Sequence, residues 1–363
     1  MSPPVASLVR CPPVSRLEPE WRELEARSDP PVFLSWAWIG SWIAEFGLPE
    51  TLARVGQGGR TIGLALLGCR RGGGVVDWLR RPSLHLNETG DPHLDSVMTE
   101  YNGLLACGDG GQAAALVAAL VGAGAPPWRE LHLSGVPESW VGLCRDKGLM
   151  VRLLRAPQGA PFTDFADLAP GDPLEALSRN SRQQIRRSLR WFERRGAVTL
   201  SRADDAAQAI RWLAALEELH GASWRAREKP GAFGNARFGA FHRTLIGRSF
   251  AEGVPDLLWV RAGSETIGYL YNFVWRGWAY SYQSGLVYQD DPDCRPGLVA
   301  HLLAMRRYRE QGLKGYRFLA GDSRYKASFA TGRDSLLWLV VYRSDWSRRL
   351  ACRRSGFLET TTP

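Results

Sequence analysis

Hydrophobic positions along the chain recur with two different periods, which predict helices alternating with strands. The first strong signal is an aromatic and aliphatic stripe at helical spacing over 33–46, which Gly47 ends. Apolar runs at 61–67 and 75–79 flank the glycine-rich sequence CRRGGG and predict a hairpin. The polar stretch 82–103 that follows predicts a solvated loop or a lip beside a substrate site. The rest of the first half alternates in the same way, with helices expected at 112–121 and 137–147 and strands at 130–133 and 150–154.

In the second half, the predicted elements change from helices to strands part-way along. This half opens with three predicted helices, of which the first carries seven arginines around an apolar stripe. Runs rich in aromatic and β-branched residues then predict antiparallel strands with hairpin-sized connections. The expected elements are helices 173–195, 204–219 and 238–252, strands 257–261, 266–275 and 279–286, helix 298–311, strand 316–319, a helical turn 325–329 and strand 336–342.

A proline-rich stretch between these halves marks the expected domain boundary. The sequence APQGAPFTDFADLAPGDP contains four prolines. At about 100–200 residues per domain, a chain of 363 residues is expected to form two domains. We therefore expect an α/β protein with domains at 1–165 and 166–363, the second carrying the arginine-rich helix 173–195.

The positive charge of the chain does not by itself identify a class of binding partner. The net charge is +9, which is compatible with nucleic acid, a membrane surface or an anionic cofactor. Only four of the 46 basic residues are lysine, so the charge also fits a general arginine bias. The six cysteines form no C-x-x-C pair, and the polar loop lacks fixed ligand spacing, so no metal is expected. Without a signal peptide or a long apolar span, a cytoplasmic location is expected.

The strongest candidate for chemistry is the sequence CRPG before helix 298–311. A helix N-terminus offers backbone N–H groups and a positive dipole end to a phosphate. Pro296 can begin the helix, Gly297 allows close approach of a ligand, and Arg295 adds positive charge beside Leu298. An ordinary helix start has the same sequence features, so the motif alone leaves both interpretations open.

Several segments, in order, resemble a known family. They are PVFLSWAWIGSWIAEFG, NSRQQIRRSLRWFERRG, FHRTLI, IGYLYNF, AYSYQSGL, RPGLVAHLLA and GDSRYKASFATG, which span roughly residues 30–342. Together they resemble the cellulose-biosynthesis-associated (CelD/BcsL-like) acetyltransferases of the GNAT superfamily, relatives of the Fem-type transferases. The resemblance implies two GNAT-like halves with mixed, mainly antiparallel sheets flanked by helices. It also implies transfer of an acetyl or other acyl group from acyl-CoA, whereas the Fem relatives use aminoacyl-tRNA.

The resemblance implies roles for individual residues. Tyr325 corresponds to the tyrosine that protonates the leaving thiolate in GNAT enzymes, and a phenol is protonated at neutral pH. A tyrosine buried in the core is equally compatible with this position. Lys326 beside it could neutralise a CoA phosphate or be an ordinary surface residue. For the general base the candidates are Asp322, which alternatively caps a helical turn, and His301, which alternatively packs in the core.

Two further groups are candidates for substrate contact. Alternate residues of the strand before the loop would face the acyl group or the acceptor, and the candidates there are Tyr280, Tyr282, Gln283 and Ser284. On the arginine-rich helix, Arg182 and Arg186 are candidates for an acidic partner, although a solvated helix face is equally compatible with the pattern.

The predicted function is direct acyl transfer from acyl-CoA to an amine-type acceptor, a small molecule or a glycan. One alternative is a Fem-like transferase that uses aminoacyl-tRNA. The other is a non-catalytic GNAT scaffold in exopolysaccharide assembly. The sequence does not identify the acceptor or the length of the acyl chain.

Overall fold

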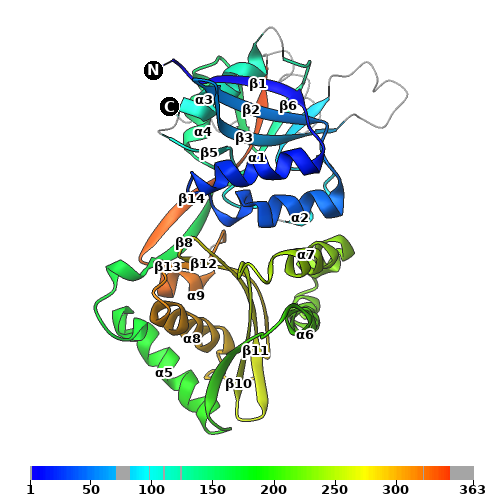
Figure 1. Ribbon diagram of the computed structural model, residues 1–363. Helices are drawn as coiled ribbons and strands as arrows, with labels where there is room; N and C mark the ends of the chain where they lie inside the picture. The colour runs from blue at the N-terminus through cyan, green and yellow to red at the C-terminus, as the bar shows by residue number, and fades with distance from the viewer. Residues whose placement is uncertain are drawn as a thin grey trace. The chain divides into compact units, whose positions relative to one another are not determined.

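The computed structural model describes residues 2–70, 82–97, 99–108, 111–122, 125–321 and 323–343, except the side chain of Arg324. The expected strand 75–79 and the candidate Asp322 lie outside these residues. Two compact units are formed (Figure 1). The first comprises 1–39, 46–157 and 336–363, and the second comprises 40–45 and 158–335. No helix in the described ranges is long and apolar enough to span a membrane.

The N-terminal unit is built on a mixed sheet with strand order β1-β2-β3-β4-β6-β14, in which β5 also pairs with β3 and β7 with β14. The β4–β6 pair is parallel, and the other pairs are antiparallel. Helix α3 and residues of α4 complete a hydrophobic core around Trp128 and Trp140. The elements are β1 (Val5–Arg10), α1 (Val14–Ala26), η1 (Val32–Leu34), α2 (Trp36–Phe46), β2 (Thr51–Gln57), β3 (Arg60–Arg70), β4 (Ser83–Leu86), η3 (Asp95–Val97), β5 (Leu105–Ala106), α3 (Gly111–Val121), β6 (Glu130–Pro137), α4 (Ser139–Arg145), β7 (Met150–Leu153) and β14 (Gly332–Tyr342).

The stretch 82–103 is not the solvated loop that its polarity predicts. It begins with strand β4, and Asn87 after that strand is buried. The Asn87 side chain accepts a hydrogen bond from Leu66 N at 2.8 Å and donates to Asn102 and Gly103. The prediction was wrong because polar side chains that satisfy backbone groups can lie in a core, since their hydrogen bonds offset the cost of burial.

The C-terminal unit contains a sheet with strand order β8-β13-β12-β11-β10-β9. Strand β12 pairs with β13 in parallel, and the other pairs whose register is defined are antiparallel. The β11–β12 turn has positive φ at Arg276 and Gly277, which matches the tight hairpin predicted there. The elements are β8 (Gln158–Asp164), η4 (Phe165–Asp167), η5 (Pro173–Ala176), α5 (Arg179–Glu193), β9 (Val198–Arg202), α6 (Ala206–Arg225), η6 (Ala232–Gly234), α7 (Ala236–Ser249), β10 (Pro255–Ala262), β11 (Glu265–Trp275), β12 (Trp278–Leu286), α8 (Pro296–Glu310), β13 (Gly315–Arg317) and α9 (Arg324–Phe329).

Helices cover both faces of this second sheet. Figure 1 shows α5 and α8 on one face of β10–β12 and α6 and α7 on the other. A hydrophobic cluster that includes Ile185 of α5, Met305 of α8 and Leu270 of β11 fills the space between the first two helices and the sheet. On the opposite face, α6 approaches so closely that a Cβ at Gly285 would lie 2.4 Å from the Leu216 carbonyl oxygen. Helix α8, at whose N-terminus the candidate site begins, is thus held in a packed core.

The predicted arginine-rich helix 173–195 is interrupted. A short 3₁₀ helix, η5, ends at Ala176, and Leu177 and Ser178 are extended before α5 begins. The Ser178 hydroxyl accepts a hydrogen bond from Ser181 N at 3.2 Å, which is the geometry of an N-cap. The continuous helix was therefore a wrong prediction, since a serine before a helical run was not read as a start signal.

Candidate functional site

The loop between β12 and α8 is anchored by two side chains of helix α5. The Ser188 hydroxyl accepts a hydrogen bond from Arg295 N at 3.1 Å and donates to Arg295 O at 3.3 Å. The Trp191 indole donates to Asp291 Oδ2 at 2.7 Å, and Asp291 Oδ1 accepts from Asp293 N. Because α5 also packs on α8 through the core, the loop and the start of α8 are fixed together.

The first turn of α8 leaves one amide available for an anion. Pro296 has no N–H, and the amides of Leu298 and Val299 already donate to Arg295 O. Gly297 N is the remaining donor of this turn among the described contacts, at the positive end of the helix dipole. The Arg295 side chain is exposed, and its Nε donates to Pro292 O at 3.1 Å, which leaves the rest of the guanidinium for solvent or ligand. The predicted group Arg295, Pro296, Gly297 and Leu298 thus offers one backbone donor and a cation.

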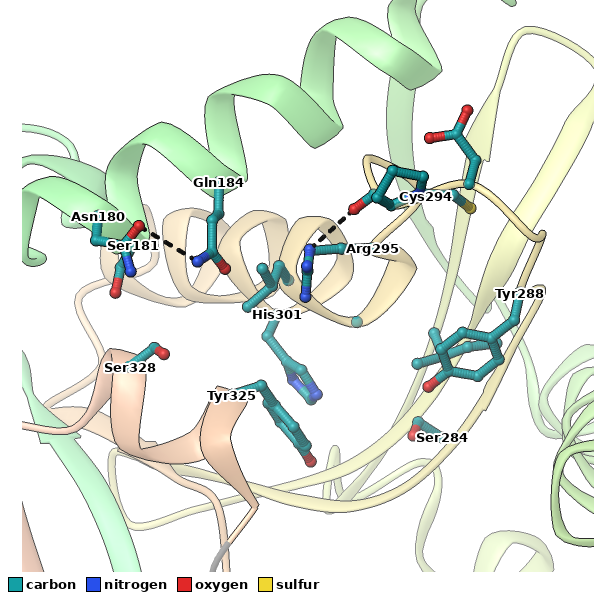
Figure 2. Close-up of a pocket in the computed structure, with 15 residues that line it drawn as sticks. Asn180, Ser181, Gln184, Ser284, Tyr288, Cys294, Arg295, His301, Tyr325 and Ser328 are labelled. Atoms are coloured by element: carbon teal, nitrogen blue, oxygen red, sulfur yellow. Dashed lines mark hydrogen bonds between the residues drawn. The ribbon is translucent and has the colours of Figure 1, made fainter. Parts of the chain in front are cut away.

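A cavity of about 730 Å³ lies beside this turn. Figure 2 shows the side chains that face it from α5, β12, the loop, α8 and α9. One wall is uncharged and polar, since Asn180, Ser181 and Gln184 reach into it from α5. The other lining residues are Ser284, Leu286, Tyr288, Asp291, Pro292, Cys294, Arg295, Gly297, Leu298, His301, Tyr325 and Ser328.

Two predicted catalytic residues meet in this cavity. The rings of His301 and Tyr325 are stacked, with centroids 5.0 Å apart and planes 9° from parallel (Figure 2). Burial, with the nearby Lys326 charge, lowers the pKa of His301 to about 3. Burial also raises the pKa of Tyr325 to about 12, although a hydrogen bond from Ser323 opposes the rise. At neutral pH the pair therefore offers a neutral imidazole and a protonated phenol.

Strands β12 and β13 separate at the same place. Their parallel pairing covers Trp278 to Tyr280 on β12, whereas β12 continues to Leu286. Backbone groups of β12 beyond Tyr280 consequently have no β13 partner on that edge. Ser284 and Leu286, from this part of β12, line the cavity. An open strand edge can donate a backbone N–H to a carbonyl oxygen that gains negative charge.

The other predicted site residues lie elsewhere in the unit. Tyr280, Tyr282 and Gln283 do not line the cavity, and the Tyr282 ring packs against Phe238, His242, Tyr271 and Phe273. The Lys326 ammonium donates to the carbonyls of Leu319 and Ala320.

The two predicted arginines of α5 make local contacts. Arg182 donates to the backbone oxygens of Glu175 and Leu177, and Arg186 forms an ion pair with Glu175 at 2.6 Å. Both therefore join η5 to α5 and do not line the cavity.

Sequence reasoning missed the polar wall on α5. Asn180, Ser181 and Gln184 follow the N-cap Ser178 at helical spacing, so they share one face of the first turns. This grouping of uncharged polar residues inside an arginine-rich helix could have predicted a polar wall. The helix was instead interpreted from its arginines. No comparable pattern in the sequence predicts that Tyr288, in the loop, lines the cavity.

A separate polar cluster lies in the N-terminal unit. His85, Glu88 and Asp95 each offer a ligand atom within 4.8 Å of the others. Asp95 already accepts hydrogen bonds from Thr89 and Gly90, and Glu88 accepts one from Ser134. Burial, reinforced by Asp95, raises the pKa of Glu88 to about 8, so a proton on Glu88 can remove the charge repulsion. The grouping is compatible with a metal, but its contacts are equally those of a self-contained polar core.

Known proteins resemble both the cavity-bearing segment and the whole fold. Residues 179–327 match the family profile described as an acetyltransferase (GNAT) domain. The C-terminal unit thus carries a GNAT acyltransferase domain. This segment includes α5, the anchored loop, α8 and Tyr325, which is the part of the chain that forms the cavity. No curated protein matches the chain.

Solved structures are similar over nearly the full length. FemX aligns with a TM-score of 0.64 at 12% identity, covering 96% of this chain and 100% of FemX. The C-terminal domain of a putative lysylphosphatidylglycerol synthetase from Agrobacterium fabrum aligns with a TM-score of 0.53 at 14% identity, covering 94% of this chain and 96% of that one. The predicted fold class, mixed α/β with a tandem GNAT-like arrangement, is therefore confirmed.

Proposed function

We propose that the cavity beside α8 binds an acyl-CoA and transfers its acyl group directly to an amine-type acceptor. The observation that carries the proposal is the meeting of three features in one cavity: the α8 N-terminus, the open edge of β12 and the His301–Tyr325 pair. The match of this segment to a GNAT profile supports acyl-CoA as the donor. The pyrophosphate would lie near Gly297 N and Arg295, where backbone and side chain both favour an anion.

The chemistry would be a single displacement without an acyl-enzyme. The amine nitrogen attacks the thioester carbonyl, the C–S bond breaks, and CoA leaves as the thiol after proton transfer. Cys294 lines the cavity, but burial raises its pKa, so the thiol stays protonated and is a poor nucleophile. Backbone N–H groups at the open β12 edge would stabilise the negative charge on the carbonyl oxygen.

Tyr325 and His301 would handle the protons. The Tyr325 phenol remains protonated at neutral pH and can donate to the leaving sulfur. His301 is neutral near pH 7, so a ring nitrogen can accept the proton of the attacking amine, and the burial that lowers its pKa to about 3 makes it a weak base. Among the described residues that line the cavity, the one carboxylate is Asp291, and its oxygens are used by Trp191 and Asp293.

Other parts of the sequence-based assignment remain proposals. They are the CelD-like family, the domain division 1–165 and 166–363, and roles for Lys326, Arg182, Arg186, Tyr280, Tyr282, Gln283 and the undescribed Asp322. The acceptor is proposed to be a small molecule or a glycan amine, since the α5 wall presents uncharged hydrogen-bonding groups.

Isothermal titration with acetyl-CoA, a longer acyl-CoA and free CoA tests the donor. We expect all three to bind with a common contribution from the CoA moiety, and their differences to report the room left for the acyl chain. The matched variants are Arg295→Glu at α8 and Arg211→Glu on the exposed surface of α6. Arg295→Glu should weaken binding about tenfold, and Arg211→Glu should leave it nearly unchanged. No binding of any of the three compounds would overturn the proposal.

The FemX-like fold is compatible with one alternative function, which is transfer from an aminoacyl-tRNA. A tRNA-dependent enzyme would bind tRNA with an affinity that falls steeply as salt is raised, because phosphate contacts release counterions. Salt-dependent tRNA binding together with no affinity for CoA would favour this alternative. A folded protein that binds neither compound would favour the non-catalytic scaffold.

A further inference from the structure

Three side chains that can bind a metal ion converge in the N-terminal unit, and none of them takes part in the proposed acyl transfer. His85, Glu88 and Asp95 each place one ligand atom within 4.8 Å of the other two. His85 and Glu88 are each 8% exposed, whereas Asp95 is half-buried, so an ion can reach the group from the side of Asp95. Their positions follow no common ligand spacing in the sequence, and the fold brings them together.

The His85 ring is fixed in place by its neighbours. Its Nε2 lies 3.0 Å from the Ser83 hydroxyl, and the ring stacks on His132 with centroids 4.3 Å apart. A Cβ at Gly90 would lie 2.7 Å from His85 Cδ2, so the glycine lets the loop after β4 lie against the ring. Histidines that bind metals are usually oriented in this way, by a hydrogen bond through their second ring nitrogen.

Both carboxylates are held but keep free acceptor positions. Asp95 Oδ1 accepts from the amide and the hydroxyl of Thr89, and its Oδ2 accepts from Gly90 N at 2.7 Å. Ser134 donates to Glu88 Oε2 at 2.9 Å, and Glu88 Oε1 accepts no hydrogen bond from a described residue. Because each carboxylate oxygen has two lone pairs, both side chains can still bind an ion.

The two carboxylates lack a countercharge. Within the described ranges, neither Glu88 nor Asp95 forms an ion pair. The Arg155 guanidinium influences Glu88 from a distance, since it lies over the Trp338 ring, 3.5 Å from the centroid. Burial lowers the pKa of His85 to about 3, so its ring is uncharged at neutral pH. Buried, unpaired negative charge is unfavourable, and a bound cation would remove this cost.

We propose that His85, Glu88 and Asp95 bind one divalent transition-metal ion, with Zn²⁺ as the best fit, and that the ion stabilises the N-terminal unit. An imidazole and two carboxylates suit Zn²⁺, whereas Mg²⁺ and Ca²⁺ prefer oxygen ligands alone. The two negative charges balance the charge of the ion. Three protein ligands leave the fourth position of a tetrahedral ion for water.

The spacing of the ligand atoms fits a site without its ion. A tetrahedral ion about 2.1 Å from each ligand needs ligand atoms about 3.4 Å apart, so side chains spaced by up to 4.8 Å would close by at most about 1.4 Å. Repulsion between the two carboxylates explains the wider spacing in the absence of the ion. The proposal does not depend on acyl transfer.

Isothermal titration of the chelator-treated, metal-free protein with Zn²⁺ tests the site. We expect one ion per chain. Glu88→Gln and His85→Asn each remove a ligand and should weaken binding about 100-fold or more. The matched control is His93→Asn, which removes an exposed imidazole of the same loop and should leave the Kd unchanged. No binding of Zn²⁺ by the wild type, or an equal loss in His93→Asn, would overturn the proposal.

X-ray absorption spectroscopy of the zinc-loaded wild type identifies the ligand elements. The site predicts nitrogen and oxygen ligands only. The chain has six cysteines, so a Zn–S contribution would mean that a thiol captures the ion elsewhere, and the proposal would fail.

Thermal unfolding distinguishes a metal site from a self-contained polar core. Glu88→Gln keeps the shape of the side chain and an acceptor for Ser134 but removes a buried negative charge. Without metal it should therefore be at least as stable as the wild type. Saturating Zn²⁺ should raise the melting temperature of the wild type by about 2 °C or more and that of Glu88→Gln by less than about 1 °C. Equal shifts, or no shift in the wild type, would contradict the proposal. Because no acyl-CoA is present, the outcome is independent of the proposed function.

Discussion

The C-terminal unit contains two buried histidine–tyrosine pairs that differ in their surroundings. His301 Nδ1 lies 2.9 Å from the Tyr316 hydroxyl, and His242 Nδ1 lies 3.2 Å from the Tyr271 hydroxyl. Burial lowers the pKa of both histidines. His242 is enclosed by the rings of Phe238, Phe241, Tyr271 and Tyr282, whereas His301 lines the cavity.

The difference shows that a buried histidine–tyrosine pair does not by itself form a functional site. An imidazole enclosed by aromatic rings can only pack, while the same group at a cavity wall can meet a substrate. Three predictions test whether this contrast is functional.

Replacement of the two histidines should give the largest contrast. His301→Gln removes the proposed base, so kcat should fall about 100-fold or more while acetyl-CoA binding changes less than about twofold. His242→Gln should lower thermal stability and leave the kcat of the folded fraction within about threefold. Steady-state kinetics and titration on both purified variants measure this, and equal losses of kcat would show that His301 has no special role.

The phenol stacked on His301 should give the next largest effect. Tyr325→Phe removes the donor to the leaving sulfur but keeps the ring, so kcat should fall about tenfold to 100-fold with acetyl-CoA affinity unchanged. Rapid-quench measurement of a single turnover isolates the transfer step from product release. An unchanged single-turnover rate would remove Tyr325 from the mechanism.

The smallest effect concerns stability against pH, and here the two pairs should behave alike. The pKa of each histidine is lower in the folded state than in the unfolded state, where it is about 6.5. The unfolded chain therefore binds more protons below that value, and stability falls as pH decreases from about 6.5 toward the folded pKa, which is about 3 for His301.

Each histidine can contribute a slope of up to about 1.4 kcal/mol per pH unit in this window. His301→Gln and His242→Gln should each flatten the slope in urea unfolding between pH 4 and 6.5, and a surface variant such as Arg211→Glu should not. A slope that neither histidine variant changes would mean that these groups are not charged on unfolding in this window.

The sequence predicted local structure better than it predicted contacts between residues far apart in the chain. Strands β10–β12 and the start of α8 followed from alternation, turn glycines and Pro296, which are local signals. The loop before α8 is held by Ser188 and Trp191 of α5, which lie 107 positions from Arg295 and 100 positions from Asp291, respectively. No periodicity encodes such contacts, so the anchoring of the loop could not be predicted.

The candidate residues show the same limit. Tyr325 and His301 were proposed from separate arguments, and the structure stacks them at one cavity. The strand residues were proposed as a group, yet a register shift on β12 opposite Tyr271 and Asn272 places Ser284 at the cavity and Tyr282 among aromatic rings. A bulge changes which side chains share a face, and the sequence contained no signal for it.

The central claim is that acyl-CoA binds at the first turn of α8. Hydrogen–deuterium exchange followed by mass spectrometry tests it most directly, with the protein alone and saturated with acetyl-CoA or CoA. The account predicts slower exchange in peptides that cover Gly297 and the open part of β12, and unchanged exchange around His242. Protection confined to other segments, or none in the presence of millimolar acetyl-CoA, would contradict it.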